Sequence, residues 1–221
     1  MNLSKLFRTT LVALAALGLA KPASSLAADK PNILIILVDD LGYGDLSCYG
    51  AKDLQSPNID LLMADGMRFD SFYANCPVCS PTRAALLSGT YPDLVGVPGV
   101  IRTHPENNWG WLSQKATLLP RTLKAAGYHT SLIGKWHLGH LPEYLPTRHG
   151  FDYWFGLVNG ANPSHKDPTN FLRNGKPVGP MKGYSCQLVV DEAAVDRGRC
   201  LVGPLAARQR HHLVHRDAGH R

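Results

Sequence analysis

The sequence contains no apolar run long enough to cross a membrane. The apolar run over residues 11–20 follows Lys5 and Arg8 at the N-terminus and is too short to span a bilayer. Small residues at 25–27 then offer a cleavage site. This arrangement predicts a signal peptide over residues 1–27. We therefore expect an exported protein, periplasmic or secreted, with no membrane attachment after the signal is removed.

Charged residues are also scarce, at 18% of the chain against 44% apolar residues. This balance excludes a disordered protein, and 221 residues suffice for one sizeable domain. The segment from Arg197 onward holds six arginines and one acid, so it carries +5 of the net charge of +6. Because the basic charge belongs to this tail, it does not indicate a nucleic-acid partner.

Cysteine is infrequent, and the count of five is odd, which excludes a fully paired disulfide framework. Cys76 and Cys79 form a C-x-x-C pattern before a predicted helix, which is typical of thioredoxin-like redox motifs. A buried cysteine that packs as a small hydrophobe is the simpler alternative. The pattern alone leaves both interpretations open.

The stretch after Cys79 predicts a helix with an anion-binding start. Ser80 suits the N-cap, Pro81 suits the first helical position, and Gly89 suits the end. Cys79 would then lie just before the free N–H groups and the positive end of the helix dipole, which favour an anion. Arg83, one turn further on, can reach back to the same point and bind oxygens in a fork.

Two carboxylates follow a predicted buried strand near the start of the chain. Residues 33–38 are six consecutive apolar residues rich in β-branched types, as in the central strand of a parallel sheet. Asp39 and Asp40 come directly after them. Ligands of open α/β sheets bind beyond the carboxyl ends of the strands, and paired carboxylates suit Ca²⁺ or Mg²⁺. A turn that ends the strand is an equally good interpretation of the residues alone.

Helices and strands alternate through the middle of the chain. We expect a helix that begins at Ser56 and is ended by Gly66, and a second helix that is capped by Thr117 and runs through Ala126. We also expect strands over 67–74 and 128–133 and a surface loop over 91–111. This β-α-β order favours an α/β fold with a wound parallel sheet.

Lys135 and His137 directly follow the strand predicted over 128–133. Being two residues apart, they can face the same way, with Trp136 opposite. Such a pair can bind an anion and move a proton. Taken alone, a surface lysine and a structural histidine are the simpler interpretation.

Three motifs together resemble those of the formylglycine-dependent (type I) sulfatases and arylsulfatases. They are C-x-P-x-R with its AALLSG tail at 79–89, VDDLGYGD at 38–45, and GKWHLG at 134–139. The resemblance implies an alkaline-phosphatase-like α/β fold, with a mostly parallel sheet flanked by helices. It covers about 28–194, as the N-terminal part of a longer domain, and implies hydrolysis of sulfuric esters.

The resemblance also implies roles for single residues. Cys79 would be converted to formylglycine by the formylglycine-generating enzyme, and its hydrated aldehyde would attack the sulfur of a sulfate ester substrate. Arg83 would hold the formylglycine. Lys135 would contact both the sulfate and the formylglycine, and His137 would hydrogen-bond the formylglycine hydroxyl.

The metal and two further candidates also come from the resemblance. Asp39, Asp40 and residue 79 would bind the divalent cation, most simply Ca²⁺, with Mg²⁺ as the alternative. Ser164 and His165 match a serine and histidine that some relatives carry close to the substrate, although a polar loop explains them equally well. Residues 150–156 are also sulfatase-like, and we interpret them as packing.

The resemblance ends near residue 194, and residues 195–221 form an Arg- and His-rich tail. Its composition suggests coding sequence read in a shifted frame, with a genuine basic tail as the alternative. The family's later metal and sulfate ligands have no counterpart here, so an inactive truncated sulfatase fragment is a second hypothesis. A phosphate or phosphonate ester hydrolase and a C-x-x-C oxidoreductase are further rivals.

Overall fold

The computed structural model describes residues 30–42, 44–162 and 164–200. The chain divides into two compact units, Met1–Asp45 and Leu46–Arg221, each of which is considered by itself. The predicted signal peptide and residues 201–221 of the predicted tail lie outside the described residues. Within the described residues, no helix is both long and apolar enough to span a membrane.

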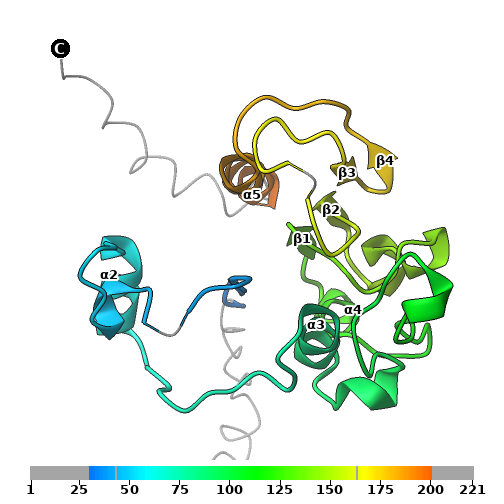
Figure 1. Ribbon diagram of the computed structural model, residues 1–221, viewed down its shortest axis with the longest axis horizontal. Helices are drawn as coiled ribbons and strands as arrows, with labels where there is room; N and C mark the ends of the chain where they lie inside the picture. Colours follow the sequence, from blue (N-terminus) through cyan, green and yellow to red (C-terminus); the bar gives the residue numbers. More distant parts are fainter. Residues whose placement is uncertain (1–29, 43, 163, 201–221) are drawn as a thin grey trace, which may run out of the picture. The chain divides into compact units, whose positions relative to one another are not determined.

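The second unit is built on a small mixed sheet with the strand order β1-β2-β3-β4. The first two strands pair in parallel, whereas the two later pairings are antiparallel (Figure 1). The parallel pairing sets Leu132 opposite Trp154. The strands are β1 (Ser131–Ile133), β2 (Tyr153–Gly156), β3 (Leu172–Arg173) and β4 (Lys176–Pro177).

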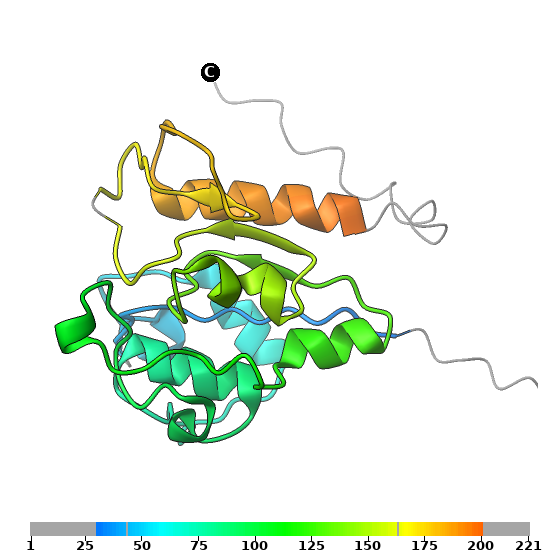
Figure 2. The same ribbon diagram turned by 90° about the vertical axis from the view of Figure 1, so that its right-hand side faces the viewer.

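Helices lie on both sides of this sheet. Helix α5 (Ser185–Cys200) runs along one side and contacts β1 and β2, while α3 (Cys79–Ser88) and α4 (Leu119–Ala125) contact each other on the other side (Figure 2). A sheet between helices is the layered arrangement of α/β proteins, as predicted. Helix α2 (Pro57–Asp65) begins one residue after the predicted start at Ser56 and ends before Gly66, as predicted.

Strand β2 is the centre of the core because its two faces serve two hydrophobic clusters. Trp154 is fully buried in the cluster that includes Ala84 of α3 and Trp136. Tyr153 and Phe155 point into the other cluster, where Phe171 is buried and Leu188 of α5 packs alongside. This alternation follows from the two-residue period of a strand. All four residues of β2 are buried, which agrees with interpreting 150–156 as packing.

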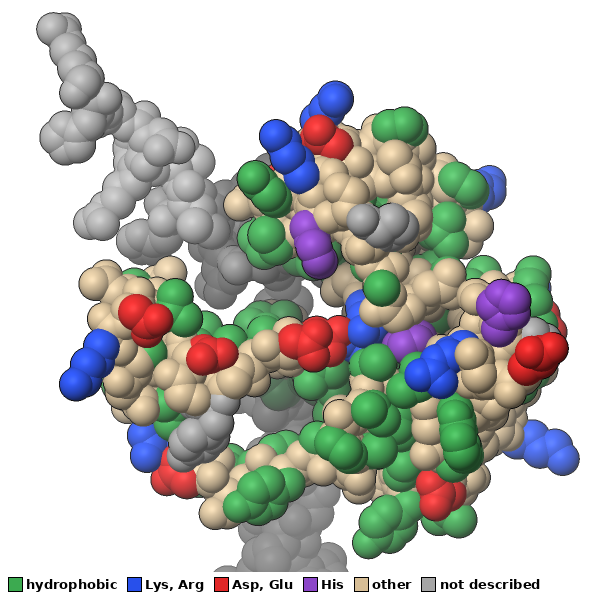
Figure 3. Space-filling view, viewed as in Figure 1, with side chains coloured by type: hydrophobic (Ala, Val, Ile, Leu, Met, Phe, Trp, Pro, Cys, Tyr) green, Lys and Arg blue, Asp and Glu red, His purple; other side chains and the backbone are tan. Residues whose placement is uncertain are grey.

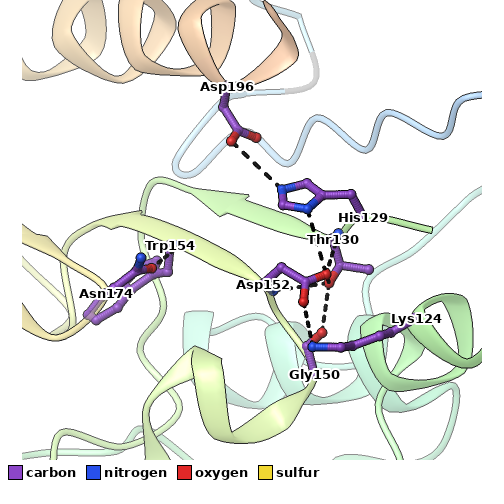
Figure 4. A network of polar contacts seen from close by, with 8 residues as sticks. All are labelled: Lys124, His129, Thr130, Gly150, Asp152, Trp154, Asn174 and Asp196. Carbon is purple, nitrogen blue, oxygen red and sulfur yellow. Dashed lines mark hydrogen bonds and ion pairs between the residues drawn. The ribbon is translucent and has the colours of Figure 1, made fainter. Parts of the chain in front are cut away.

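A polar network around Asp152 joins α4 to the start of the sheet (Figure 4). The Asp152 carboxylate accepts hydrogen bonds from Lys124 and from both the N–H and the hydroxyl of Thr130. Partial burial raises the pKa of Asp152, but these hydrogen bonds outweigh it and hold the pKa below its usual value. His129 lies between two carboxylates, 3.8 Å from Asp152 and 4.0 Å from Asp196 of α5.

Two of the predicted strands are wrong. Residues 33–38 and 67–74 form no strand, and their apolar side chains are exposed, to 82% for Leu34 and 81% for Phe72. A strand is stable only when its N–H and C=O groups pair with a neighbour, and no described segment pairs with either stretch. Hydrophobic side chains accordingly reach the surface among charged ones (Figure 3).

Other boundaries differ less from the prediction. The helix expected over 117–126 is α4, which begins at Leu119 after an N-cap at Leu118, and β1 is shorter than the predicted 128–133. The loop over 91–111 was expected at the surface, but Val97 and Ile101 are buried in the core. Val97 and Ile101 are covered because they pack in the same cluster as Trp154.

His149 is buried beside the core and is expected to make stability depend on pH. It is 1% exposed, neither ring nitrogen has a hydrogen-bond partner, and its ring centroid lies 5.8 Å from that of Trp136. Burial, and then the positive charge of Arg121, lower its pKa from 6.5 to about 4. The unfolded chain therefore binds the proton more readily, and folding stability falls as the pH drops through this window.

We expect His149 to remove about 3 kcal/mol of unfolding free energy as the pH falls from 6.5 to 4. The unfolding free energy, measured by urea denaturation at several pH values in this range, should depend less steeply on pH in His149→Phe, because phenylalanine cannot bind a proton. His104→Phe, at an exposed position, controls for the loss of one histidine. An unchanged slope in His149→Phe would contradict this account.

Candidate active site

Helix α3 begins at Cys79 itself, two residues before the predicted first helical position at Pro81. Its N-cap is Val78, in an extended conformation, and it ends at Gly89, whose φ of 68° is left-handed. The predicted N-cap, Ser80, is wrong because its hydroxyl is engaged elsewhere. Ser80 is fully buried, and its Oγ accepts the N–H of Ile101 at 3.1 Å. Cys79 thus occupies the first turn, where free backbone N–H groups favour negative charge.

The segment after β1 continues the parallel pairing and then turns sharply. The N–H groups of Trp136 and His137 donate to the carbonyls of Leu157 and Val158, at 2.8 and 3.0 Å. Trp136 is buried against the core, and its Nε1–H donates to the Tyr144 carbonyl at 2.9 Å. His137 has a φ of 58°, an uncommon conformation for a residue with a Cβ. The sequence pattern gave no sign of this turn.

Cys79 and His137, which are 58 positions apart in the sequence, meet in the structure. Cys79 Sγ lies 3.1 Å from His137 Nδ1, and His137 Nε2 lies 2.8 Å from the carbonyl oxygen of Ile101. A carbonyl can only accept, so Nε2 must carry a hydrogen. In the neutral imidazole Nδ1 is then the acceptor and faces the side chain of residue 79.

Arg83 ties α3 to the same segment from the other side. Its Nη1 donates to the backbone carbonyl of Lys135 at 2.7 Å. Both side chains are partly buried. Four of the predicted residues, Cys79, Arg83, Lys135 and His137, are therefore linked by two contacts between α3 and the end of β1.

Gly160 lies directly against the imidazole ring of His137. A Cβ built on Gly160 would lie 2.4 Å from Cε1 and 2.7 Å from Nε2 of His137, closer than real atoms approach. Only glycine fits there while the ring keeps its place. Sequence analysis missed Gly160, Ile101 and Ser80 as neighbours of the site. Their contacts come from the fold, and no local pattern marks them.

The other predicted residues are placed as follows. Asp39 and Asp40 belong to the first unit, are exposed, and follow the irregular segment 31–38; Asp40 has a φ of 57°. Asp45, the last residue of the 38–45 motif, accepts the N–H of Gly42 at 2.7 Å. In the described parts of the chain, no three His, Cys, Asp or Glu side chains gather as a metal site would require. The metal role of Asp39, Asp40 and residue 79 stays a prediction.

Ser164 and His165 lie exposed on the loop between β2 and β3. The Ser164 hydroxyl donates to the Lys166 carbonyl, and the His165 carbonyl accepts the N–H of Ser185 at the start of α5. A cavity of about 440 Å³ opens elsewhere and includes none of the predicted site residues. Its lining residues are Gln114, Arg121, Pro142, Glu143, Arg148 and His149.

Comparison with known proteins identifies the family. The sequence profile of the Sulfatase family matches residues 31–196. The chain belongs to the sulfatase family. Solved structures similar to this sulfatase include Ps i-CgsB, with a TM-score of 0.72 and 30% identity, covering 78% of this chain and 42% of that one. The PsFucS1 sulfatase from Pseudoalteromonas sp. has a TM-score of 0.54 at 30% identity, over 76% and 42% of the two chains. The predicted alkaline-phosphatase-like α/β fold is confirmed.

The curated relatives of this chain are considerably longer. N-acetylgalactosamine-6-sulfatase of Sus scrofa is 48% identical over 60% of this chain and 26% of its own length. Arylsulfatase A of Bos taurus is 47% identical over 80% of this chain and 34% of its own length. The chain thus spans about a quarter to a third of these relatives.

Gly160→Ala should displace the His137 ring, because the added methyl group would overlap it. We expect the His137 ring resonances to shift in a ¹H–¹³C spectrum of the full chain, with Cys79 alkylated at a changed rate. Gly44→Ala is the matched control, since nothing lies within 4 Å of a Cβ there. Unmoved His137 resonances in Gly160→Ala would show that the ring is not held against this glycine.

Proposed function

We propose that this chain carries part of the active site of a sulfuric ester hydrolase of the arylsulfatase type. In this proposal, Cys79 is converted to formylglycine by the formylglycine-generating enzyme, and a divalent cation, Ca²⁺ or Mg²⁺, assists. The single observation that supports it most is the 3.1 Å contact between Cys79 Sγ and His137 Nδ1. It brings together two sequence motifs that a redox C-x-x-C site would leave unexplained.

His137 is proposed to act as the base at residue 79. The formylglycine hydrate would supply a hydroxyl that attacks the sulfur of the ester, and the alcohol then leaves. The Nδ1 lone pair of His137 faces this position, so it can accept the hydroxyl proton. The Ile101 carbonyl stabilises the ring once it is protonated, because Nε2–H already donates to it.

Three features would stabilise negative charge at residue 79. The first turn of α3 presents free N–H groups and the positive end of its dipole. Arg83 on α3 and Lys135 on the segment after β1 add two positive charges. We propose that Lys135 binds the sulfate group, while Arg83 holds residue 79 and fixes the Lys135 backbone. Ser164 and His165 are proposed as outlying substrate contacts.

The candidate ligands for the cation are of a suitable chemical type, but they are too few to complete its coordination. Asp39 and Asp40 offer hard oxygen ligands, which Ca²⁺ and Mg²⁺ prefer, but Ca²⁺ takes roughly six to eight ligands. With residue 79 they would form only part of a site. A bound cation would lower the pKa of the attacking hydroxyl and neutralise the sulfate.

The substrate class follows from relatives and chemistry. The curated relatives are named as sulfatases of N-acetylgalactosamine 6-sulfate and of aryl sulfates. We propose a sulfate ester of a sugar or an aryl alcohol as substrate. The predicted signal peptide would export the protein.

Expression with the formylglycine-generating enzyme, followed by mass analysis of the Cys79 peptide and an aryl sulfate assay, tests this proposal. We expect an aldehyde at residue 79 that reacts with a hydrazide probe, and sulfate release above a Cys79→Ala control. His137→Ala should keep the aldehyde and lose turnover by about 10²-fold or more.

The outcomes separate the rival functions. An aldehyde with no turnover would favour the inactive fragment, and an unmodified thiol with reversible Cys76–Cys79 oxidation would favour the oxidoreductase. Preferential release of phosphate from an aryl phosphate would favour a phosphoesterase. Each of these results would contradict sulfuric ester hydrolysis by this chain.

A further inference from the structure

We propose that Ser80 is a positioning residue that fixes the tautomer of His137 through the backbone of Ile101. The inference rests on the proposed role of residue 79, because it concerns the nitrogen that faces that residue. It assigns a function to the variable position of the C-x-P-x-R motif, which the motif itself leaves open.

The first link joins Ser80 to Ile101. Ser80 is fully buried and Ile101 is 4% exposed, so water is excluded from both. The Ser80 Oγ accepts the Ile101 N–H at 3.1 Å, across 21 positions of sequence. A buried N–H needs an acceptor, and this hydroxyl supplies it. The contact therefore pins one point of the 91–111 loop to the first turn of α3.

The second link joins Ile101 to His137. The carbonyl of the same residue lies 2.8 Å from His137 Nε2, and His137 is 5% exposed. Because the N–H and the C=O of Ile101 are both engaged, the loop can move little at this residue. The carbonyl then requires a hydrogen on Nε2, which makes Nδ1 the acceptor in the neutral ring.

The third link returns to the start of the helix. His137 Nδ1 lies 3.1 Å from Cys79 Sγ, and Cys79 is the residue before Ser80. The contacts thus form a closed ring through Cys79, Ser80, Ile101 and His137. The opposite tautomer would place a hydrogen on Nδ1, which could then no longer accept a proton from residue 79. Gly160 leaves no room for the imidazole to settle elsewhere.

The test is the tautomer of His137, read from long-range ¹H–¹⁵N spectra of the full chain with Cys79 unmodified. In the neutral ring of the wild type we expect a protonated Nε2 and an unprotonated Nδ1. Ser80→Ala should yield a mixture of tautomers, whereas Ser80→Thr, which keeps the hydroxyl, should restore the single form.

Ser88→Ala is the matched control. Ser88 lies on the same helix, and its hydroxyl donates to the Ala84 carbonyl at 2.6 Å within that helix. It should leave the tautomer unchanged. A wild-type ring protonated on Nδ1, or a Ser80→Ala variant that folds and keeps the wild-type tautomer, would overturn the proposal. If Ser80→Ala does not fold, the test is Ser80→Thr, and a mixture of His137 tautomers in that variant would overturn the proposal.

This readout does not depend on turnover. All three variants keep Cys79, Pro81 and Arg83, so the modification motif is intact. Failure to release sulfate in every variant, with the tautomers as expected, would count against the proposed function and leave the positioning role standing.

Discussion

The arrangement of the candidate site depends on one interaction, the placement of the His137 ring between the side chain of Cys79 and the backbone carbonyl of Ile101. On one side the imidazole meets the first residue of α3, and on the other it donates to the Ile101 carbonyl. Neither α3 nor the segment after β1 could shift alone without breaking one of these contacts. The hydrogen bond from Arg83 to the Lys135 carbonyl joins the same two elements a second time.

The packing of the core allows the His137 ring to take this position. Trp136, the neighbour of His137, is buried, and His137 turns the other way through a left-handed backbone conformation. Such a conformation costs roughly 1–2 kcal/mol for a residue with a side chain. The backbone bonds from Trp136 and His137 to the segment after β2 offset that cost. The packing of the sheet and the chemistry of the site are therefore linked through adjacent residues.

Sequence analysis predicted where α2 and α3 end because a glycine ends a helix through local chemistry, but it misplaced the start of α3. Gly66 and Gly89 do end α2 and α3. It failed for the strands over 33–38 and 67–74, because an apolar pattern marks a strand only where a partner strand is available. At the site, motif spacing identified the residues that meet, Cys79 and His137 among them. Ser80, Ile101 and Gly160 could not be found that way, since buried backbone contacts across the fold leave no sequence signature.

The exposed apolar stretches carry a practical consequence. Segments 31–38 and 67–74 present large side chains to solvent, with Leu34, Met67, Phe72 and Tyr73 each about 80% exposed. Apolar surface of this extent marks a site of association, and it raises the free energy of the isolated chain in water. A cell that makes this polypeptide would therefore need chaperones to shield it, and a purified sample would adhere to hydrophobic resins and self-associate as its concentration rises.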